Sequence, residues 1–296
     1  MDRDALRIAN MLVGNDEGAA AIEAALIGPA IAFDQPTLVA IGGGDLEASV
    51  NGAPAPCWHP MLIPRGGTLR FGRALFGCRA YVAVAGGIDV PAVFGSRSTY
   101  LRADFGGHEG RPLRSGDLLQ AGEPSALSTK IASGLPEHGA VAPWSIGGTL
   151  RPRYSDDLIV RLIPGAHTTA LNGVSQERLF DATFRISSNS DRMGYRLEGI
   201  ELALETPIEM LSEGVVFGTM QLPPGGAPIV LMADGQTTGG YPRIGEVATV
   251  DLPLMAQLKP GDRVRFRSIS VQDAQQAYLD HERELTQARY AIALRR

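Results

Sequence analysis

The chain reads Pro-Ile-Val-Leu-Met-Ala-Asp-Gly-Gln-Thr-Thr-Gly-Gly-Tyr-Pro-Arg-Ile-Gly over residues 228–245. Its first part, Ile229 to Ala233, is a short unbroken apolar run, which is typical of a strand buried on both faces. The run stops at Asp234, and polar side chains between glycines follow it. Glycine lets a backbone approach a ligand closely, and amide, hydroxyl and guanidinium groups supply directed hydrogen bonds. The stretch therefore predicts a binding loop for an amide-like group at the end of a buried strand, or else a plain tight turn.

The rest of the second half also has the pattern of a β-rich unit. Apolar runs predict strands, and a helix followed by the start of a strand is expected over 174–184; the expected strands are 158–163, 247–252 and 263–266. Ser270-Val-Gln-Asp273 has the spacing of a capping box, so it predicts the start of a C-terminal helix.

The first half shows the same preference for strands. A short helix is expected from the apolar spacing before Gly14-Asn15, and strands are expected within 19–33 and at 38–41, 61–63, 68–71 and 80–85. Glycine-rich turns separate these strands at short intervals, which argues for a barrel or sandwich. The predicted fold class is therefore mainly β, a β-rich α+β protein with a C-terminal helix.

A length of 296 residues fits two domains of ordinary size. Residues 1–120 are expected to form the first unit and 158–296 the second, with the Pro-, Gly- and Ser-rich segment 121–157 as a linker. Each half also runs from a Leu-x-Gly strand to a Leu-x-x-Gly-Asp turn. Two related β-rich units would explain this echo, as would chance and generic turn chemistry.

Composition excludes several classes of function. The formal net charge of −5 gives no basic footprint for nucleic acid. The sequence has no run of eighteen apolar residues, so no membrane span is predicted. The charged N-terminus is unlike a secretory signal. With 44% apolar and 20% charged residues, the chain has the composition of a soluble globular protein, and we expect it to be cytoplasmic. Cys57 and Cys78 form no ligand pair and are expected to pack as small hydrophobic residues.

The scarcity of lysine excludes further chemistry. Lys130 and Lys259 are the only lysines in the sequence, and neither lies in a P-loop or in an Ala-Met-Lys-Met biotin-attachment setting. The chain is therefore not expected to carry biotin, and Schiff-base chemistry is not expected. No Ser-His-Asp order and no metal-ligand cluster is evident, so we predict neither a metal nor a self-contained hydrolase.

Several longer motifs have a familiar order. In the second half they are Asp-Arg-Met-Gly-Tyr-Arg-Leu, Ser-Glu-Gly-Val-Val and Ala-Asp-Gly-Gln-Thr-Thr-Gly-Gly-Tyr-Pro; in the first half they are Gly-Gly-Ile-Asp-Val-Pro, Gly-Ser-Arg-Ser-Thr and Phe-Gly-Gly-His-Glu-Gly-Arg. Together they resemble the biotin-dependent carboxyltransferase family, also called allophanate hydrolase subunit 2, over essentially the whole chain. The resemblance implies two cyclophilin-like β-barrel subdomains. Members usually carry a segment ahead of the part that matches Met1–Leu6, so either the start codon is misassigned or the first barrel is expected to lack its N-terminal strand.

The resemblance also implies the function. The family includes the C subunit of prokaryotic 5-oxoprolinase, which this chain resembles most, together with the carboxyltransferase domain of urea carboxylase and antagonists of a sporulation-kinase inhibitor. The leading hypothesis is the C subunit of an ATP-dependent 5-oxoprolinase, an amidohydrolase that acts in a complex with the A and B subunits as partners. Since the chain has no P-loop, any nucleotide site would be of another type or shared with the B subunit. The alternatives are a carboxyltransferase component acting on urea or another small amide, and a non-catalytic regulator of a B-subunit homologue.

Candidate site residues come from the polar, glycine-rich stretches. Arginines could clamp a carboxylate or phosphate, neutral donors could orient an amide, and a tyrosine or glutamate could move a proton. The substrate-binding candidates are Arg192, Arg196, Gln236, Thr237, Thr238, Arg243, Arg97 and Thr99, and the candidates for proton transfer are Tyr195, Glu213 and Tyr241. Each arginine could equally form a surface ion pair, and Tyr195 could instead pack in the core with its hydroxyl satisfied. The candidates around Arg192 and around Gln236 are expected to share one recess.

Overall fold

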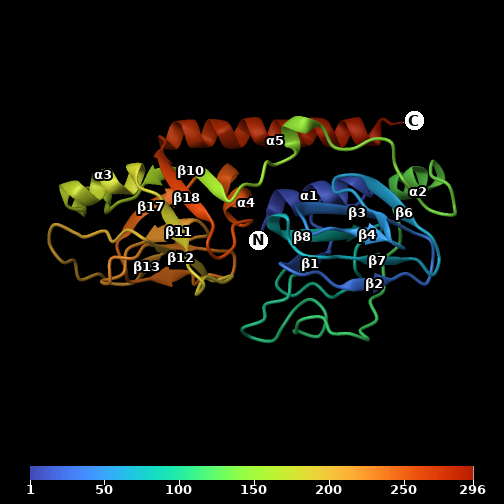
Figure 1. The fold of residues 1–296 in the computed structure, drawn as a ribbon, viewed down its shortest axis with the longest axis horizontal. Helices are drawn as coiled ribbons and strands as arrows, with labels where there is room; N and C mark the ends of the chain where they lie inside the picture. Colours follow the sequence, from blue (N-terminus) through green and yellow to red (C-terminus); the bar gives the residue numbers. More distant parts are fainter. Residues whose placement is uncertain (296) are drawn as a thin grey trace. The chain divides into compact units, whose positions relative to one another are not determined.

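The computed structural model describes residues 1–295, which divide into two compact units. The N-terminal unit comprises Arg3–Pro152 and the residues from Glu284 onward. The barrel unit comprises Met1–Asp2 and Arg153–Arg283. Figure 1 shows both units as mainly β with few helices, so the predicted fold class is confirmed.

The N-terminal unit begins with helix α1 (Arg3–Leu12), which packs its apolar face on strands β3 and β8. Ala5, Ile8, Ala9 and Leu12 are fully buried on this face. The helix stops before Gly14, whose φ of +76° is the left-handed conformation that glycine adopts readily. The predicted helix and its end are confirmed.

Two sheets complete the N-terminal unit. The five-stranded sheet has the order β1-β8-β3-β6-β9, and its strands are Ile22–Ala25, Phe76–Val84, Thr37–Asp45, Pro60–Ile63 and Ala140–Val141. The four-stranded sheet has the order β2-β7-β4-β5, and its strands are Ala30–Ala32, Thr68–Arg70, Ser49–Val50 and Ala53–Pro54. Their apolar residues form one core, with Val39, Ile41, Ile63, Leu69 and Val82 fully buried. The strands predicted in this half are all present, arranged as two sheets and not as one closed barrel.

The segment 121–157, predicted to be a linker, contains regular structure. Helix α2 (Ala126–Ser133) is capped by Ser125, whose hydroxyl accepts a hydrogen bond from Ser128 N at 3.0 Å. Ser128 Oγ in turn donates to Val13 O. A 3₁₀ turn, η1 (Gly148–Leu150), follows strand β9. The chain passes to the barrel unit after Pro152, so most of this segment belongs to the N-terminal unit.

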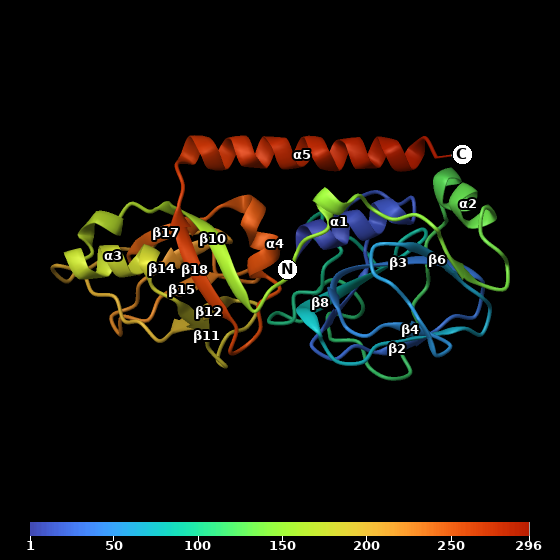
Figure 2. The same ribbon diagram turned by 45° about the horizontal axis from the view of Figure 1, so that its top comes forward.

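Seven strands of the barrel unit close into a barrel in the order β10-β17-β14-β15-β12-β11-β18. In that order they are Asp157–Pro164, Arg243–Val247, Thr219–Gln221, Ile229–Leu231, Gly194–Glu198, Phe184–Ile186 and Arg263–Ser268. Fully or nearly fully buried apolar side chains fill the barrel, including Leu162, Val230 and Phe184. Helix α3 (Gly173–Asp181) packs against β18, as Figure 2 shows.

One predicted strand of the second half is wrong. Residues 247–252 were expected to be extended, but β17 ends at Val247 and the turn η3 (Thr249–Asp251) leads into the short helix α4 (Leu252–Met255). Pro253 cannot donate to a β ladder and suits the first turn of a helix. The carboxylate of Asp251 accepts hydrogen bonds from Arg161 N at 2.7 Å and Arg161 Nε at 2.9 Å, which holds the turn against β10.

A small outer layer covers part of the barrel. Strands β13 (Glu213–Gly214) and β16 (Thr238–Gly239) pair with each other and not with the barrel strands. In β14, Met220 lies in the barrel core, so Thr219 and Gln221 point to the outer face. Both are nevertheless buried. Gly239 of the outer layer packs on Gln221, and Val216 N donates to Thr219 Oγ1 at 3.0 Å. The stretch quoted first thus runs from barrel strand β15 through β16 of this layer to the start of barrel strand β17.

The C-terminal helix α5 (Val271–Ala293) begins as predicted, since Ser270 Oγ accepts a hydrogen bond from Asp273 N at 3.1 Å. Its residues up to Arg283 group with the barrel unit and the later ones with the N-terminal unit. Of the helices in residues 1–295, none combines the length and apolar character that a membrane span requires.

Candidate functional site

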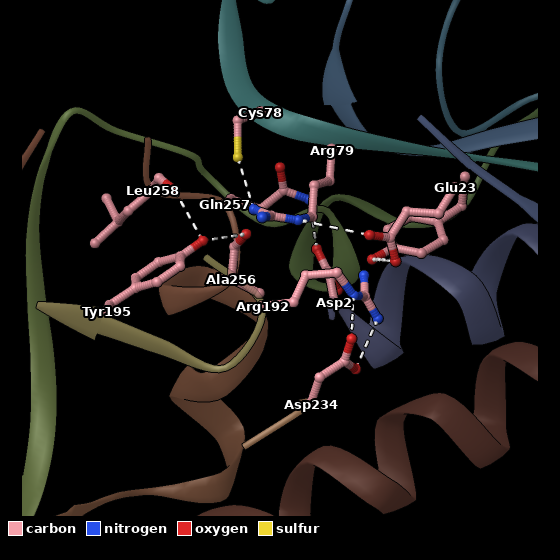
Figure 3. A network of polar contacts seen from close by, with 11 residues as sticks. Asp2, Glu23, Cys78, Arg79, Arg192, Tyr195, Asp234, Ala256, Gln257 and Leu258 are labelled. Carbon is pink, nitrogen blue, oxygen red and sulfur yellow. Dashed lines mark hydrogen bonds and ion pairs between the residues drawn. The ribbon is translucent and has the colours of Figure 1, made fainter. Parts of the chain in front are cut away.

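The two polar clusters of the second half meet at an ion pair. Arg192 Nε lies 2.8 Å from Asp234 Oδ2, and Arg192 Nη2 lies 3.3 Å from Oδ1, so the guanidinium forms a bidentate ion pair with the carboxylate. Asp234 N also donates to Arg192 O at 2.8 Å. The carboxylate is 14% exposed and the guanidinium side chain 33%. Figure 3 shows the two side chains directed at each other. The polar residues around Arg192 are therefore joined directly to the start of the glycine-rich loop at Asp234.

From Asp234 the chain crosses the outer face of β14. Gln236 Nε2 lies 3.4 Å from Gln221 Oε1, and Gln221 Nε2 lies 3.5 Å from Tyr241 O. Gly239 packs directly on the Gln221 amide, and a Cβ at this position would collide with it. Gln221 is 1% exposed. Its buried amide thus supports the loop from beneath at three points.

The far end of the loop is anchored to the strands. Arg243 starts β17, and its Nη2 lies 2.7 Å from Glu213 Oε2 on β13. Arg243 N donates to His167 Nδ1 at 3.1 Å, and His167 N donates back to Arg243 O at 3.0 Å. Arg243 Nε is buried, and within residues 1–295 no acceptor faces it. We call the region from Arg192 and Asp234 to Arg243, with Glu213, Gln221 and His167, the loop face.

The loop face presents mostly neutral donors to solvent. The side chains of Gln236, Thr237 and Thr238 are exposed, and Tyr241 is 43% exposed. The backbone of Thr237 is fixed, because its carbonyl accepts a hydrogen bond from Val215 N at 3.0 Å. Hydroxyl and amide groups held on a fixed backbone suit a ligand that carries carbonyl oxygens and an amide N–H.

Two predicted site residues lie elsewhere in the barrel. Tyr195 is 2% exposed, and its hydroxyl donates to Leu258 O at 3.0 Å, as Figure 3 shows. The structure therefore contradicts the predicted role of Tyr195 in proton transfer and places it in the core. Arg196 is exposed on the outer face of β12, since strand alternation directs it away from its buried neighbours Tyr195 and Leu197. No hydrogen bond of its side chain ties Arg196 to the loop face within residues 1–295.

Two further predicted residues, Arg97 and Thr99, belong to the N-terminal unit. Arg97 Nε donates to Val90 O at 3.2 Å. The Thr99 hydroxyl packs on Gly107, one of the glycines with positive φ in this loop. Both residues therefore help to order a glycine-rich loop of their own.

In the same loop, Arg111 is committed to an ion-pair cluster. Its guanidinium contacts Asp117 at 2.8 Å and Glu109 at 2.6 Å. The hydrogen bond to Arg111 is the largest cause that holds the pKa of Asp117 well below its usual range, followed by a bond from Arg114 N. Arg111 thus forms a structural ion pair. This is the alternative to ligand binding that the sequence left open for arginines.

Three residues of the loop face are not identified by the sequence patterns. Gln221 sits between Met220 and Leu222 in an apolar run, and its burial depends on the distant outer layer. His167 follows a Pro-Gly-Ala turn, and its partner Arg243 is 76 residues away. Asp234 marks only the end of a strand in the sequence. The one usable signal is Gln221, a polar residue within an apolar run, because a buried polar group requires partners.

Two other features of the described residues bear on ligands. A cavity of about 370 Å³ lies between α3 and the turn 223–226, and none of the predicted site residues lines it. No group of three or more His, Cys, Asp or Glu side chains within residues 1–295 is arranged to hold a metal ion.

Known proteins are similar to this chain in sequence and in fold. Residues 1–268 match the family described as the carboxyltransferase domain, subdomain A and B. The chain is 37% identical over 292 residues to the C subunit of 5-oxoprolinase from Haemophilus influenzae and from Escherichia coli, covering 99% of this chain and 89% of each relative. The solved structure of Kluyveromyces lactis urea carboxylase superposes with a TM-score of 0.87 at 29% identity, covering 97% of this chain and 26% of that one. These matches confirm the resemblance predicted from the motifs.

Proposed function

Because the chain belongs to the family of the carboxyltransferase domain, subdomain A and B, we propose that it is the C subunit of an ATP-dependent 5-oxoprolinase. In this role it opens the lactam of 5-oxoproline to L-glutamate together with the A and B subunits. The observation that supports the proposal most is the match with the 5-oxoprolinase C subunits, which extends over nearly the full length of both chains.

The loop face has the groups that a lactam carrying a carboxylate requires. Gln236 and Thr238 offer an amide and a hydroxyl to the lactam N–H and carbonyl. Arg243 offers a partly exposed guanidinium for the carboxylate, beside its ion pair with Glu213. Arg192 is less available to a ligand, because two of its nitrogens already bind the carboxylate of Asp234.

Proton transfer falls to the two remaining candidates. Tyr241 has a half-exposed ring, and Glu213 is exposed with its carboxylate beside Arg243. A carboxylate can act as a general base and a phenol as a hydrogen-bond donor, so we assign the base to Glu213 and a donor role to Tyr241. Preorganised donors at an oxygen that gains charge contribute about 3–4 kcal/mol each to catalysis.

The nucleotide is assigned to the complex and not to this chain alone. The sequence has no P-loop and no biotin-attachment lysine. ATP would therefore bind on a partner protein or at a site shared with the B subunit, and no biotin would be attached here.

The test is reconstitution of the three subunits with 5-oxoproline and ATP, measuring glutamate release. We expect release to require this chain and to fall about 100-fold with Thr238→Val, because one donor to the substrate is lost. Thr183→Val is the matched control, since Thr183 is exposed in the same unit just before β11. Undiminished release without the chain would reject the proposal.

A second candidate is supported by the superposition on urea carboxylase. In that role the loop face would hold the ureido ring of carboxybiotin, which offers the same carbonyl and N–H groups as a lactam. Carboxylation of urea or a small amide that depends on this chain and on a separate biotin carrier would favour this candidate over the first.

A further inference from the structure

His167 occupies a fixed position within the loop face. It lies between β10 and the 3₁₀ turn η2 (Thr168–Ala170), where Thr168 Oγ1 donates to Ile244 O at 2.7 Å. His167 N donates to Arg243 O at 3.0 Å. Gly165 packs so closely on the backbone of Arg243 and Gly245 that a Cβ would not fit there. The imidazole is therefore attached to a short, tightly held connection.

The hydrogen bond from Arg243 N selects the form of the imidazole. Arg243 N–H is a donor and lies 3.1 Å from His167 Nδ1, so Nδ1 must act as the acceptor. In a neutral imidazole the proton then lies on Nε2. If Nδ1 carried a proton, its N–H would face the N–H of Arg243, and two donors would be opposed. The geometry thus selects a neutral ring with an Nε2–H donor.

The ring lies against the backbone of Arg243, one of the residues proposed to bind the substrate. His167 is half-buried, and it forms hydrogen bonds with both the backbone N and the backbone O of Arg243. The Arg243 side chain holds Glu213 at 2.7 Å, and Tyr241 lies two residues earlier on the same segment. Because Nδ1 faces the backbone of β17, Nε2 on the other side of the ring faces away from it.

We propose that His167 is a catalytic residue that donates its Nε2–H to a ligand oxygen that carries or gains negative charge. The inference rests on the proposed function, since it supplies a donor to the reacting carbonyl of a lactam or ureido group. A neutral imidazole suits this task, because it stabilises a developing oxyanion without holding a full charge in the ground state.

A purely structural role for His167 is the competing explanation, and two substitutions separate the two. In His167→Asn, the side-chain oxygen can still accept from Arg243 N, but no donor reaches the Nε2 position. In His167→Gln, the longer side chain places an amide nitrogen near the Nε2 position. His138→Asn is the control, because His138 is exposed in a loop of the N-terminal unit.

The kinetic experiment uses the three reconstituted subunits with 5-oxoproline and ATP. We expect His167→Asn to lower kcat by about 100-fold and His167→Gln to retain clearly more activity, with His138→Asn unchanged. Urea denaturation of each variant verifies folding. Full activity of His167→Asn, or equal losses in the Asn and Gln variants with unchanged unfolding midpoints, would overturn the proposal.

A second readout needs no substrate. Two-bond ¹⁵N–¹H correlation spectra of the free chain, with the His167 signals assigned by their loss in His167→Asn, report which ring nitrogen carries the proton. We expect the Nε2–H tautomer, and the Nδ1–H tautomer would overturn the proposal. If glutamate release proved independent of this chain, the proposed function would fail by itself, and the spectra would still report on the ring.

Discussion

Replacing Gly239 by alanine tests how the outer layer of the barrel is built. Gly239 is buried in β16, and a Cβ there would lie closer than 3.0 Å to the Gln221 amide nitrogen. To restore an ordinary contact the amide must retreat by roughly 1 Å. Gln221 is 1% exposed, so it has little space for this movement. Its contacts with Gln236 and with Tyr241 O, at 3.4 and 3.5 Å, would be lost.

The expected cost combines two effects. Overpacking of a filled site costs about 1–3 kcal/mol. The two hydrogen bonds are long, so each adds less than about 1 kcal/mol. We therefore expect Gly239→Ala to lower the free energy of unfolding of the barrel unit by about 2 kcal/mol. Turnover in the reconstituted complex should fall as well, because the loop that carries Thr238 is displaced.

Urea denaturation of the intact chain measures the change in stability, and the chain offers a matched control. Gly214 on the paired strand β13 has no atom near its Cβ position, so Gly214→Ala should change stability by less than about 0.5 kcal/mol. In a Gln221→Ala background the clash disappears, so Gly239→Ala should cost much less there. Equal costs of Gly239→Ala in the two backgrounds, or no cost in either, would refute the reasoning.

Three further predictions follow from ion pairs and burial. Alanine substitutions of Arg192 and Asp234 in a double-mutant cycle should give a coupling of about 1–2 kcal/mol by urea denaturation, and a coupling of zero would contradict the observed two-nitrogen grip. Burial, aided by a nearby carboxylate, raises the pKa of the Cys57 thiol to about 12, so Cys57 should resist iodoacetamide at pH 8 in the native chain, and rapid labelling before unfolding would count against this. Arg111 holds the pKa of Asp117 below its usual range, so the pair stabilises the loop fully above about pH 4 and loses this contribution as the pH falls below that value. The protection of the amides of residues 105–117, taken relative to the intrinsic exchange rate at each pH, should therefore fall on acidification in the parent chain but not in Asp117→Asn, and identical pH profiles of protection would refute the assignment.

Local patterns in the sequence predicted some of the barrel strands, but not β14 or β17. Ile229–Ala233, 158–163 and 263–266 each carry enough apolar residues for their burial to be recognised. The same alternation could have placed Tyr195, because Tyr195 and Leu197 alternate with Arg196 and Glu198 and so face the core together. The misplaced strand at 247–252 shows the limit of such runs, since Pro253 and the carboxylate of Asp251 decide the backbone there.

The loop face depends on contacts that no local pattern encodes. Strands β13 and β16 have two residues each, which is too short for a periodic signal. The burial of Gln221 and the bond between His167 and Arg243 join segments far apart in the chain. The polar clusters themselves were recognisable from the sequence, but their partners were not.

The central claim is that the substrate binds at the loop face, and hydrogen exchange in the assembled complex measures this most directly. With saturating 5-oxoproline, the account predicts slower exchange in peptides that span 234–243 and 212–216, and unchanged exchange in those from 126–133 of helix α2. Protection confined to other segments, with 234–243 exchanging as fast as in the free complex, would contradict it.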